Sequence, residues 1–467
     1  MSQKISRRTF LAGTGAVAAA TLVACTAPVA PAETGGEAPA PSGEQITLGF
    51  SVWGAVQEDV LYTEVYIPDY EEKNPNIKIE FLSIPDFDDY YDKLIQLHAA
   101  GTPIDVQRHN VQRLGQVVSK DMLIDMKGLY ERDSIPTDDF LTGIMPAISR
   151  EGGEKIYALP QDENLHGLYY NAELFDEAGL PYPGDDYTFD QLVADAEALT
   201  KKDSNGDIEV FGYISWWNWW NLQGHVMADG GKIWENLRTP EEVAVVDDAW
   251  YQALGLWKEK LAESFILAPG SQQTGNLGAN VFFEQGRAAL FDDGTWRAPF
   301  VKKAAPDLKF GVATFPKGTR KVSRGSTVCW GDSTGTKYPD ESWEFTKYLF
   351  TPEALEAYWQ ILWVAPPSRL SVVTSDAFKN ITGLDAGGID YPGIDNEEEF
   401  NRVENWIVTT LTNGWDTQEC LGDNYNILER EMDAAIESVL IEGSNVSVEQ
   451  AINTAVENTN KEIALNR

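Results

Sequence analysis

The sequence predicts an α/β protein whose folded part is divided into two lobes. Apolar residues alternate with smaller or polar ones over residues 46–52 and 77–81, and a helical pattern over about 58–73 separates the two stretches. Strand, helix and strand in this order form a βαβ unit, which is parallel and right-handed in nearly all proteins. The folded part has about 420 residues, more than one core of ordinary size holds. Helical and strand patterns alternate along the rest of the chain, which favours α/β over an all-β body.

The next elements of the first lobe follow directly. A second helix is predicted from Asp88 to about Gly101, because apolar residues recur on one face and glycine commonly ends a helix. Residues 104–106 are expected to form a short buried strand. In open α/β sheets ligands bind where strands run into loops, so we expect the ligand edge at Trp53 and at residues 108–110.

The middle and the end of the chain carry further helix signals. Residues 156–171 are expected to be extended and to carry the chain from one lobe to the other. Thr188 and Gln191 have the spacing of a capping box. Further helices are predicted from about 239–261, with Pro240 in the first turn, and from 339–350, with another starting at 351–352.

The N-terminus is typical of an export signal. Arg7 and Arg8 precede an apolar run over 11–24 that is too short to span a bilayer, and the pattern resembles a twin-arginine signal. Residues 22–25 look like a lipoprotein box, in which Cys25 becomes the lipidated first residue of the mature chain. Residues 26–44 are rich in Ala, Pro, Gly and Glu and are expected to form a disordered tether. We therefore expect an extracytoplasmic protein on the outer face of a bacterial cytoplasmic membrane, held there only by its lipid.

Charge and cysteines limit the partners. The formal net charge is −37, which disfavours nucleic acid and anionic lipid surfaces. Cys329 and Cys420 remain once Cys25 is assigned to lipid, and the sequence leaves open whether they form a disulfide or stay as buried thiols. No cofactor motif is visible, and a monomer is expected.

Several segments resemble, in this order, the extracellular solute-binding proteins of ATP-binding-cassette importers, in the carbohydrate-binding group that includes maltose-binding protein. The segments that carry the resemblance are Tyr91-Asp-Lys-Leu94, Ala100-Gly-Thr-Pro-Ile-Asp-Val106, Tyr157-Ala-Leu-Pro160, Tyr169-Tyr-Asn-Ala-Glu-Leu-Phe-Asp-Glu-Ala-Gly179, Phe283-Glu-Gln-Gly-Arg-Ala-Ala289, Gly294-Thr-Trp296, Phe315-Pro-Lys-Gly318, Ser342-Trp-Glu-Phe345 and Thr351-Pro-Glu-Ala354. Each motif is weak alone, but their common order over about 45–440 is specific.

The resemblance implies a periplasmic-binding-protein-like fold with the ligand in a cleft between two lobes. One lobe would comprise 45–161 and 315–365, and the other 162–314 and 366–467. Hinge segments are implied near 159–163, 313–316 and 365–368. Closure would be a hinge motion driven by ligand contacts that only the closed state makes.

Candidate ligand residues follow from the needs of a sugar. Aromatic faces cover the C–H faces of pyranose rings, while acids and amides pair with hydroxyls. The run Trp216-Trp217-Asn218-Trp219-Trp220 supplies aromatics beside polar residues, and part of it is expected to be core. The candidate set is Trp53, His109, Asn110, Asp162, Glu163, Asn164, Trp216, Trp217, Trp219, Trp296, Trp330, Asp332, Trp363 and Arg369.

These candidates have different grounds. The resemblance puts Trp296 in the cleft, places 162–164 near the first hinge, and places His109 and Asn110 after the third strand, where relatives carry an aromatic residue. Trp330, Asp332 and Trp363 could equally be core, and Arg369 could equally form a surface ion pair. Asp203, Asn205, Asp207 and Glu209 have alternating oxygen ligands that could wrap Ca²⁺, but the twelfth position lacks a bidentate Glu, and a polar turn explains them without metal.

The predicted function is a receptor that captures a sugar or oligosaccharide outside the cell and delivers it to an importer made of other chains. An exported glycoside hydrolase is the main alternative, since it also needs tryptophans and carboxylates. The sequence lacks local nucleophile and phosphate-loop motifs, which favours binding over catalysis. A binding protein for another solute, such as a glycerol phosphate, and a surface adhesin or scaffold remain further alternatives.

Overall fold

The computed structural model describes residues 45–54, 58–262, 278–379, 397–441 and 443–467. The export signal, Cys25 and the tether predicted from the sequence lie outside these described residues.

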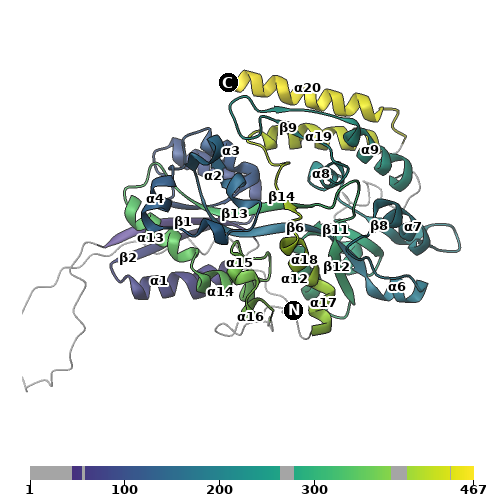
Figure 1. Cartoon of the computed structure of the whole chain (residues 1–467), viewed down its shortest axis with the longest axis horizontal. Helices are drawn as coiled ribbons and strands as arrows, with labels where there is room; N and C mark the ends of the chain where they lie inside the picture. The colour runs from purple at the N-terminus through teal and green to yellow at the C-terminus, as the bar shows by residue number, and fades with distance from the viewer. Residues whose placement is uncertain (1–44, 55–57, 263–277, 380–396, 442) are drawn as a thin grey trace, which may run out of the picture. The chain divides into compact units, whose positions relative to one another are not determined.

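A continuous mixed sheet forms the centre of the fold (Figure 1). In spatial order its main strands are β2 (Ile77–Ile84), β1 (Ile46–Trp53), β3 (Val106–Asn110), β13 (Ser323–Asp332), β6 (Leu159–Asn171), β11 (Ala288–Gly294), β8 (Ile208–Ile214) and β7 (Lys201–Lys202). Two further strands, β12 (Phe310–Thr314) and β14 (Asp416–Thr417), pair with β6 and β13 respectively. Short two-stranded ladders join β4 (Ser149–Arg150) to β5 (Lys155–Ile156) and β9 (Trp234–Glu235) to β10 (Val243–Ala244).

The first half of the sheet confirms the predicted βαβ unit. β1 runs parallel to both β2 and β3, and the crossover is a π-helical segment, Leu61–Tyr66, that continues into α1 (Ile67–Lys73). The second predicted helix is α2 (Phe87–Ala99), whose first turn is capped by the Asp86 carboxylate. Leu48, Phe50 and Trp330 belong to the hydrophobic core of this half.

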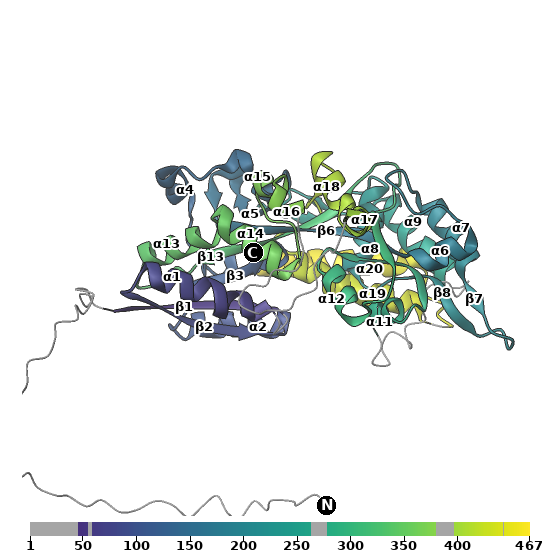
Figure 2. The same ribbon diagram turned by 90° about the horizontal axis from the view of Figure 1, so that it is seen from below.

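The halves are joined by two long strands. β6 is extended and buried over its whole length, as expected for 156–171. Its first part pairs antiparallel with β13, which in turn pairs with β3, while its second part pairs with β11 and β12. Figure 2 shows β6 between the half that holds β1 to β3 and the half that holds β8. Side chains on β6 and β13 can therefore face elements of both halves.

Helices cover both halves of the sheet. In chain order they are α3 (Val111–Val118), α4 (Lys127–Asp133), α5 (Ile144–Ile148), α6 (Ala172–Ala178), α7 (Phe189–Leu199), α8 (Trp219–Ala228), α9 (Asp248–Leu256), a π-helical segment Trp257–Ala262, α11 (Ala279–Glu284), α12 (Arg297–Ala304), α13 (Pro339–Leu349), α14 (Pro352–Leu362), α15 (Leu370–Val373), α16 (Asp376–Lys379), α17 (Glu397–Val403), α18 (Asn405–Thr412), α19 (Tyr425–Leu440) and α20 (Val448–Asn466). Single 3₁₀ turns lie at Thr137–Asp139 and Glu151–Gly153. The last two helices pack against each other along the upper edge in Figure 1.

The predicted capping box is present at α7, where Thr188 and Gln191 satisfy each other's backbone donors. Helices α13 and α14 begin at their prolines, as the sequence predicts. Two other expectations are wrong. The third strand begins at Val106 rather than at 104, so His109 lies inside β3 instead of in the loop after it.

The helix expected to start at Pro240 starts instead at Asp248, with the Asp247 carboxylate as its cap. Val243 and Ala244 pair with Glu235 and Trp234 in the short β9–β10 ladder, which holds this stretch extended. The β-branched residues in this stretch favour strand over helix, and the pairing with β9 keeps the stretch from joining the helix.

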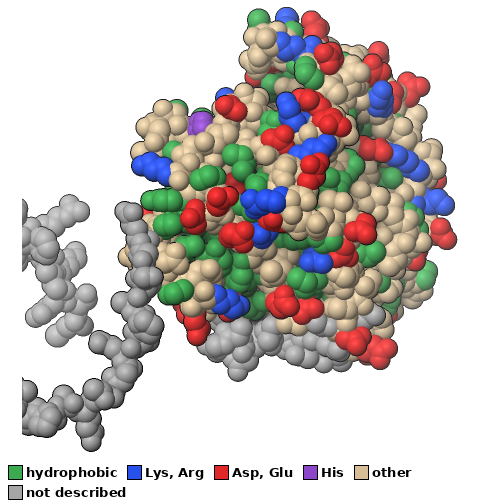
Figure 3. Space-filling model, turned by 60° about the vertical axis from the view of Figure 1, so that its left-hand side comes forward, with side chains coloured by type: hydrophobic (Ala, Val, Ile, Leu, Met, Phe, Trp, Pro, Cys, Tyr) green, Lys and Arg blue, Asp and Glu red, His purple; other side chains and the backbone are tan. Residues whose placement is uncertain are grey.

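The two remaining cysteines settle one open alternative. Cys329 and Cys420 are both buried free thiols. Burial raises the pKa of Cys420 to about 12 and that of Cys329 further, so neither is a reactive thiolate at neutral pH. On the surface, Figure 3 shows acidic and basic side chains interspersed over the face that it presents. Within the described ranges, no helix combines the length and apolarity that a membrane crossing needs.

Candidate functional site

A line of polar side chains crosses the middle of the sheet where the halves meet. Ser326 on β13 donates to the Asn110 Oδ1 at 2.9 Å, and its carbonyl accepts from the Asn164 Nδ2 at 3.1 Å. Thr295 Oγ1 lies 3.5 Å from the Asn164 Oδ1. The line therefore begins at the end of β3, passes through β13 and β6, and ends at the residue before Trp296.

Two predicted acids beside this line are buried and already bonded within the protein. Asp162 accepts from the Tyr358 hydroxyl at 2.7 Å and from Asn164 at 2.8 Å. Burial raises its pKa to about 7, against the nearby Arg108 charge, which lowers it. Glu163 accepts from Thr327 at 2.6 Å and from Gln418 at 2.7 Å, and burial raises its pKa well above the usual range. Both acids tie crossing strands together and leave little capacity for ligand.

Three aromatic rings gather next to the polar line. The Trp220 ring lies 6.2 Å from that of Trp296 and 6.4 Å from that of Tyr425, measured between ring centres. Trp220 and Trp296 are each partly exposed, whereas Tyr425, at the start of α19, is fully buried. Trp220 and Trp296 can therefore offer ring surface to a ligand, while the buried Tyr425 ring supports Trp220.

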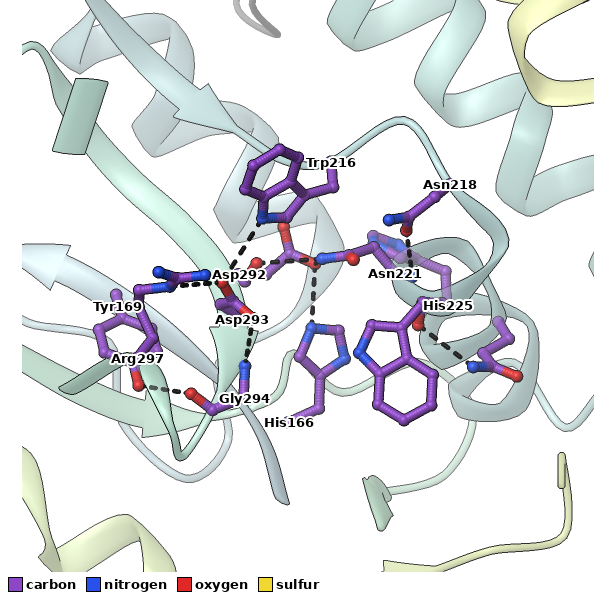
Figure 4. Close-up of polar contacts among 12 residues, drawn as sticks. His166, Tyr169, Trp216, Asn218, Asn221, His225, Asp292, Asp293, Gly294 and Arg297 are labelled. Atoms are coloured by element: carbon purple, nitrogen blue, oxygen red, sulfur yellow. Dashed lines mark hydrogen bonds and ion pairs between the residues drawn. The ribbon is translucent and has the colours of Figure 1, made fainter. Parts of the chain in front are cut away.

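An ion pair fixes the loop that carries Trp296. Asp293 Oδ2 accepts from the Arg297 Nε at 2.8 Å and from the Trp216 Nε1 at 3.4 Å (Figure 4). The carbonyl of Gly294 accepts from the Tyr169 hydroxyl at 2.7 Å. Trp216 is partly exposed, so the sequence candidate is held at the site through its indole N–H.

The neighbouring carboxylate, Asp292, belongs to a buried network. It accepts from the Tyr213 hydroxyl at 2.7 Å and from Asn221 Nδ2 at 3.0 Å, and His166 Nε2 lies 3.3 Å away (Figure 4). Burial alone would raise the pKa of Asp292, but His166, the nearby His225 and Ser215 together lower it to about 2. Burial lowers the pKa of His166. This network anchors the first turn of α8, and so the tryptophan run, to β11.

Arg324 on β13 stands out among the charged residues. Its guanidinium carbon lies 3.3 Å from the centre of the Trp220 ring, and the residue as a whole is only 2% exposed. Within the described ranges, none of its three nitrogens has a hydrogen-bond partner. Burial lowers its pKa to about 10, which leaves it charged at neutral pH.

The structure places four sequence candidates inside packed cores. Trp219 is fully buried and stacks on Trp250, with ring centres 4.6 Å apart. Trp330 packs against Phe50, and Trp363 ends α14 with 1% exposure. Asp332 is fully buried and accepts from Thr346 at 2.6 Å. These residues support the lobes in this structure, so we leave them out of the proposed contact set.

His109 and Arg369 also lie apart from the aromatic group. His109 is fully buried, and burial lowers its pKa to about 3, so it is neutral. Arg369 donates to the Asp139 carboxylate at 2.7 Å, so the ion pair that the sequence left open as its alternative role is present.

Trp53 packs with Phe87 and Tyr90, and the Arg108 guanidinium lies 4.7 Å from its ring centre. Trp217 is partly exposed but is in no ring contact with Trp296 among the described residues.

Trp220, Tyr425 and Arg324 are not among the candidates that the sequence predicts. Trp220 was visible in the tryptophan run, but only the helix start at Trp219 decides which ring faces the core. No sequence signal marked Tyr425 or Arg324, because their proximity to Trp220 is a long-range contact.

The calcium alternative gains no support. Asp203 Oδ1 accepts from the backbone N–H groups of Asn205 and Asp207, which closes a polar turn between β7 and β8. Among the described residues, no group of three or more His, Cys, Asp or Glu is arranged to hold a metal ion.

Known proteins resemble this chain in sequence. The family model for bacterial extracellular solute-binding proteins matches residues 66–386, and the model of the twin-arginine translocation signal matches residues 4–24. A multiple sugar-binding protein of Streptococcus mutans is 24% identical over 323 residues, covering 63% of this chain and 69% of that protein. A maltooligosaccharide ABC transporter solute-binding lipoprotein of Streptococcus pneumoniae is 25% identical over 366 residues, covering 76% of this chain and 78% of that protein.

Solved structures share the fold. An ABC substrate-binding protein from Listeria monocytogenes in complex with cycloalternan matches with a TM-score of 0.70 at 19% identity, over 90% of this chain and 100% of that chain. A solute-binding protein from Thermotoga lettingae bound with α-D-tagatose matches with a TM-score of 0.70 at 20% identity, over 90% of this chain and 100% of that chain. These likenesses confirm the two-lobed α/β fold that the sequence predicts. The signal indicates export from the cytoplasm, and the chain belongs to the bacterial extracellular solute-binding proteins.

Proposed function

We propose that this protein is a lipid-anchored receptor that binds a sugar or oligosaccharide outside the cytoplasm and delivers it to an ABC-type importer. The observation that carries the proposal is the pair of partly exposed indoles, Trp220 and Trp296, beside the amides of Asn110 and Asn164. Flat apolar faces next to hydrogen-bonding amides match the two kinds of surface on a pyranose. The relatives from Streptococcus mutans and Streptococcus pneumoniae are named for sugars and maltooligosaccharides, which supports the same ligand class.

The proposed mechanism is closure of two lobes, 45–161 with 315–365 and 162–314 with 366–467, about hinges near 159–163, 313–316 and 365–368. Contacts between the first and third of these segments support it. The Glu163 N–H donates to the Pro366 carbonyl at 2.9 Å, and the Ser368 N–H donates to the Gln161 carbonyl at 3.0 Å. Segments that are bonded side by side can bend as one hinge.

The anchor is proposed from residues 22–25 and from the lipoprotein among the relatives. A tether between Cys25 and the folded body would keep a released ligand near the importer. Mass spectrometry of membrane-extracted protein should find acyl chains on Cys25. Recovery of the native protein in the soluble fraction after export, with an unmodified N-terminus, would contradict the anchor.

Ligand binding can be tested by thermal shift and calorimetry over monosaccharides, oligosaccharides, sugar alcohols, amino acids and glycerol phosphates. A ligand at 100 times its Kd should add about 2.7 kcal/mol to the free energy of unfolding. Trp296→Ala should weaken a sugar by roughly 1–3 kcal/mol without unfolding the protein. Tyr182→Ala, which removes an exposed ring that packs on Tyr170, is the matched control and should leave affinity unchanged.

Two outcomes would reject the ligand class or the binding role. Stabilisation by glycerol phosphates or amino acids, with no response to any saccharide, would assign the cleft to another solute. Release of sugar from oligosaccharides or p-nitrophenyl glycosides by the purified protein would make it a glycoside hydrolase.

A further inference from the structure

A buried arginine that lacks hydrogen-bond partners among the described residues lies in the proposed site, and this inference rests on the proposed function. Arg324 is 2% exposed, and its Nε, Nη1 and Nη2 form no hydrogen bond with any residue that the structure describes. Leaving the donors of a buried charged group unsatisfied is costly, and native structures tolerate it mainly at functional sites. Arg324 therefore has donors left for acceptors that the described part of the chain does not supply.

The carboxylates closest to the site are already engaged. Asp293 is paired with Arg297 at 2.8 Å and also accepts from Trp216. Asp292 accepts from Tyr213 and Asn221. Neither carboxylate forms an ion pair with Arg324, so the guanidinium has no fixed counterion among the described residues.

The contact with Trp220 determines which part of Arg324 a ligand can meet. A separation of 3.3 Å between the guanidinium carbon and the ring centre places the cation against the face of the indole. The N–H donors of a guanidinium radiate in its own plane, so a stacked ring occupies the face and leaves the edge for acceptors. A saccharide that packs on the partly exposed Trp220 and Trp296 would thus bring its substituents toward this edge.

We infer that Arg324 binds an anionic oxygen group on the ligand, so that the protein's substrate is an acidic saccharide whose sugar ring packs on Trp220 and Trp296 and whose uronate carboxylate meets the guanidinium. A carboxylate offers two coplanar oxygens that match the guanidinium fork. Hydroxyls of a neutral sugar offer weaker acceptors and leave the buried charge unneutralised.

The acidic surface does not oppose this inference. The formal net charge is −37, but exposed charges are screened beyond about 8 Å at physiological ionic strength. A group in contact with Arg324 would interact mainly with that cation and with the neutralised pair of Asp293 and Arg297.

The test compares acidic ligands with matched neutral ones on the full mature protein. The probes are galacturonate, glucuronate and their short oligomers, the corresponding neutral sugars, the methyl ester of galacturonate and glucose 6-phosphate. Calorimetry on the wild type should show the uronate binding at least tenfold more tightly than its neutral counterpart and its methyl ester. Preference for glucose 6-phosphate over both uronates would assign Arg324 to a phosphate and overturn the uronate assignment.

Variants separate a ligand contact from a structural role. Arg324→Gln should weaken the uronate by roughly 10- to 100-fold and leave the affinity for the neutral sugar unchanged. Arg320→Gln removes a half-exposed arginine four residues earlier, paired with Glu419, and should change neither affinity. Arg324→Lys keeps the positive charge but lacks the forked N–H donors of the guanidinium. Its affinity for the uronate should therefore lie between those of the wild type and Arg324→Gln.

Two further results would overturn the inference. Equal affinity of the wild type for uronate, ester and neutral sugar would do so even if no variant folds. Equal weakening of acidic and neutral ligands by Arg324→Gln would show that the arginine only supports Trp220. Both results would leave the proposed sugar-binding function intact. If no saccharide bound the wild-type protein, the proposed function itself would be rejected.

Discussion

Trp296 folds back over Gly294 so closely that a Cβ at position 294 would lie 2.0 Å from a carbon of the indole ring. Gly294 ends β11, and its carbonyl is held by the Tyr169 hydroxyl. The backbone cannot move away from the ring without breaking that bond. The glycine of the Gly-Thr-Trp motif therefore sets the position of the ring that is proposed to cover the sugar.

Gly294→Ala should displace the Trp296 ring and weaken sugar binding by roughly 1–3 kcal/mol, the range expected for losing an aromatic anchor. Calorimetry with the best saccharide from the screen measures this loss. Gly128→Ala, on α4 where a Cβ would meet nothing within 4 Å, is the control and should leave affinity unchanged. Wild-type affinity in the Gly294→Ala protein would show that Trp296 does not contact the ligand.

Adjacent tryptophans should respond in opposite ways. Trp219→Ala removes a fully buried ring that stacks on Trp250 and should cost about 3–5 kcal/mol of the free energy of unfolding. Trp220→Ala removes a partly exposed ring that contacts Trp296 and Arg324, and should reduce affinity far more than stability. Denaturant unfolding and calorimetry on both variants measure the two effects. A Trp220→Ala protein with unchanged affinity would remove this ring from the site.

The fold was more predictable than the site for a physical reason. The βαβ unit at 46–81 and the capping box at Thr188 follow from periodicity and from side-chain to backbone bonds within a few residues. The start of the helix near 240 failed because Val243 and Ala244 pair with Glu235 and Trp234 in the neighbouring short strand, and this pairing overrode the proline signal.

Contacts between distant segments also decide which candidates reach the site. Trp296 and Asn164 could be proposed from a family resemblance, but the choice between Trp219 and Trp220 depends on where α8 begins. Arg324 became a candidate only when its missing partners were known. Whether a polar group is satisfied is a property of the whole packed structure, which local sequence patterns do not encode.

The cysteines give a prediction about redox state. Cys329 and Cys420 are 0% exposed and unpaired, and burial raises the pKa of both. We expect both thiols to resist alkylation in the native protein and to react completely after denaturation without reductant. Peptide mapping after iodoacetamide labelling distinguishes these two cysteines from Cys25. A Cys329–Cys420 linked peptide, or a fall in thermal stability on adding dithiothreitol, would contradict the free-thiol state.

A buried carboxyl predicts how stability depends on pH. Asp332 accepts one hydrogen bond from Thr346, and its other oxygen has no hydrogen-bond partner in the described part of the chain. Burial raises its pKa from 3.8 to about 7. Between these two values the native protein holds a proton that the unfolded chain has released, so the free energy of unfolding should fall as pH rises from about 4 to about 7. Above about pH 7 Asp332 is ionised in both the native and the unfolded protein, so its contribution to the free energy of unfolding no longer changes with pH.

Asp332→Asn should abolish this residue's share of the decline, because an amide does not titrate. The difference in the free energy of unfolding between variant and wild type should shift in favour of the variant by roughly 2–4 kcal/mol from pH 4 to pH 8. The buried amide has its own hydrogen-bonding cost, so the change with pH is measured rather than the value at one pH. Asp340→Asn, which removes an exposed carboxyl on the same helix as Thr346, is the matched control. A difference for Asp332→Asn that does not change with pH would mean that Asp332 is ionised throughout this range in the folded protein.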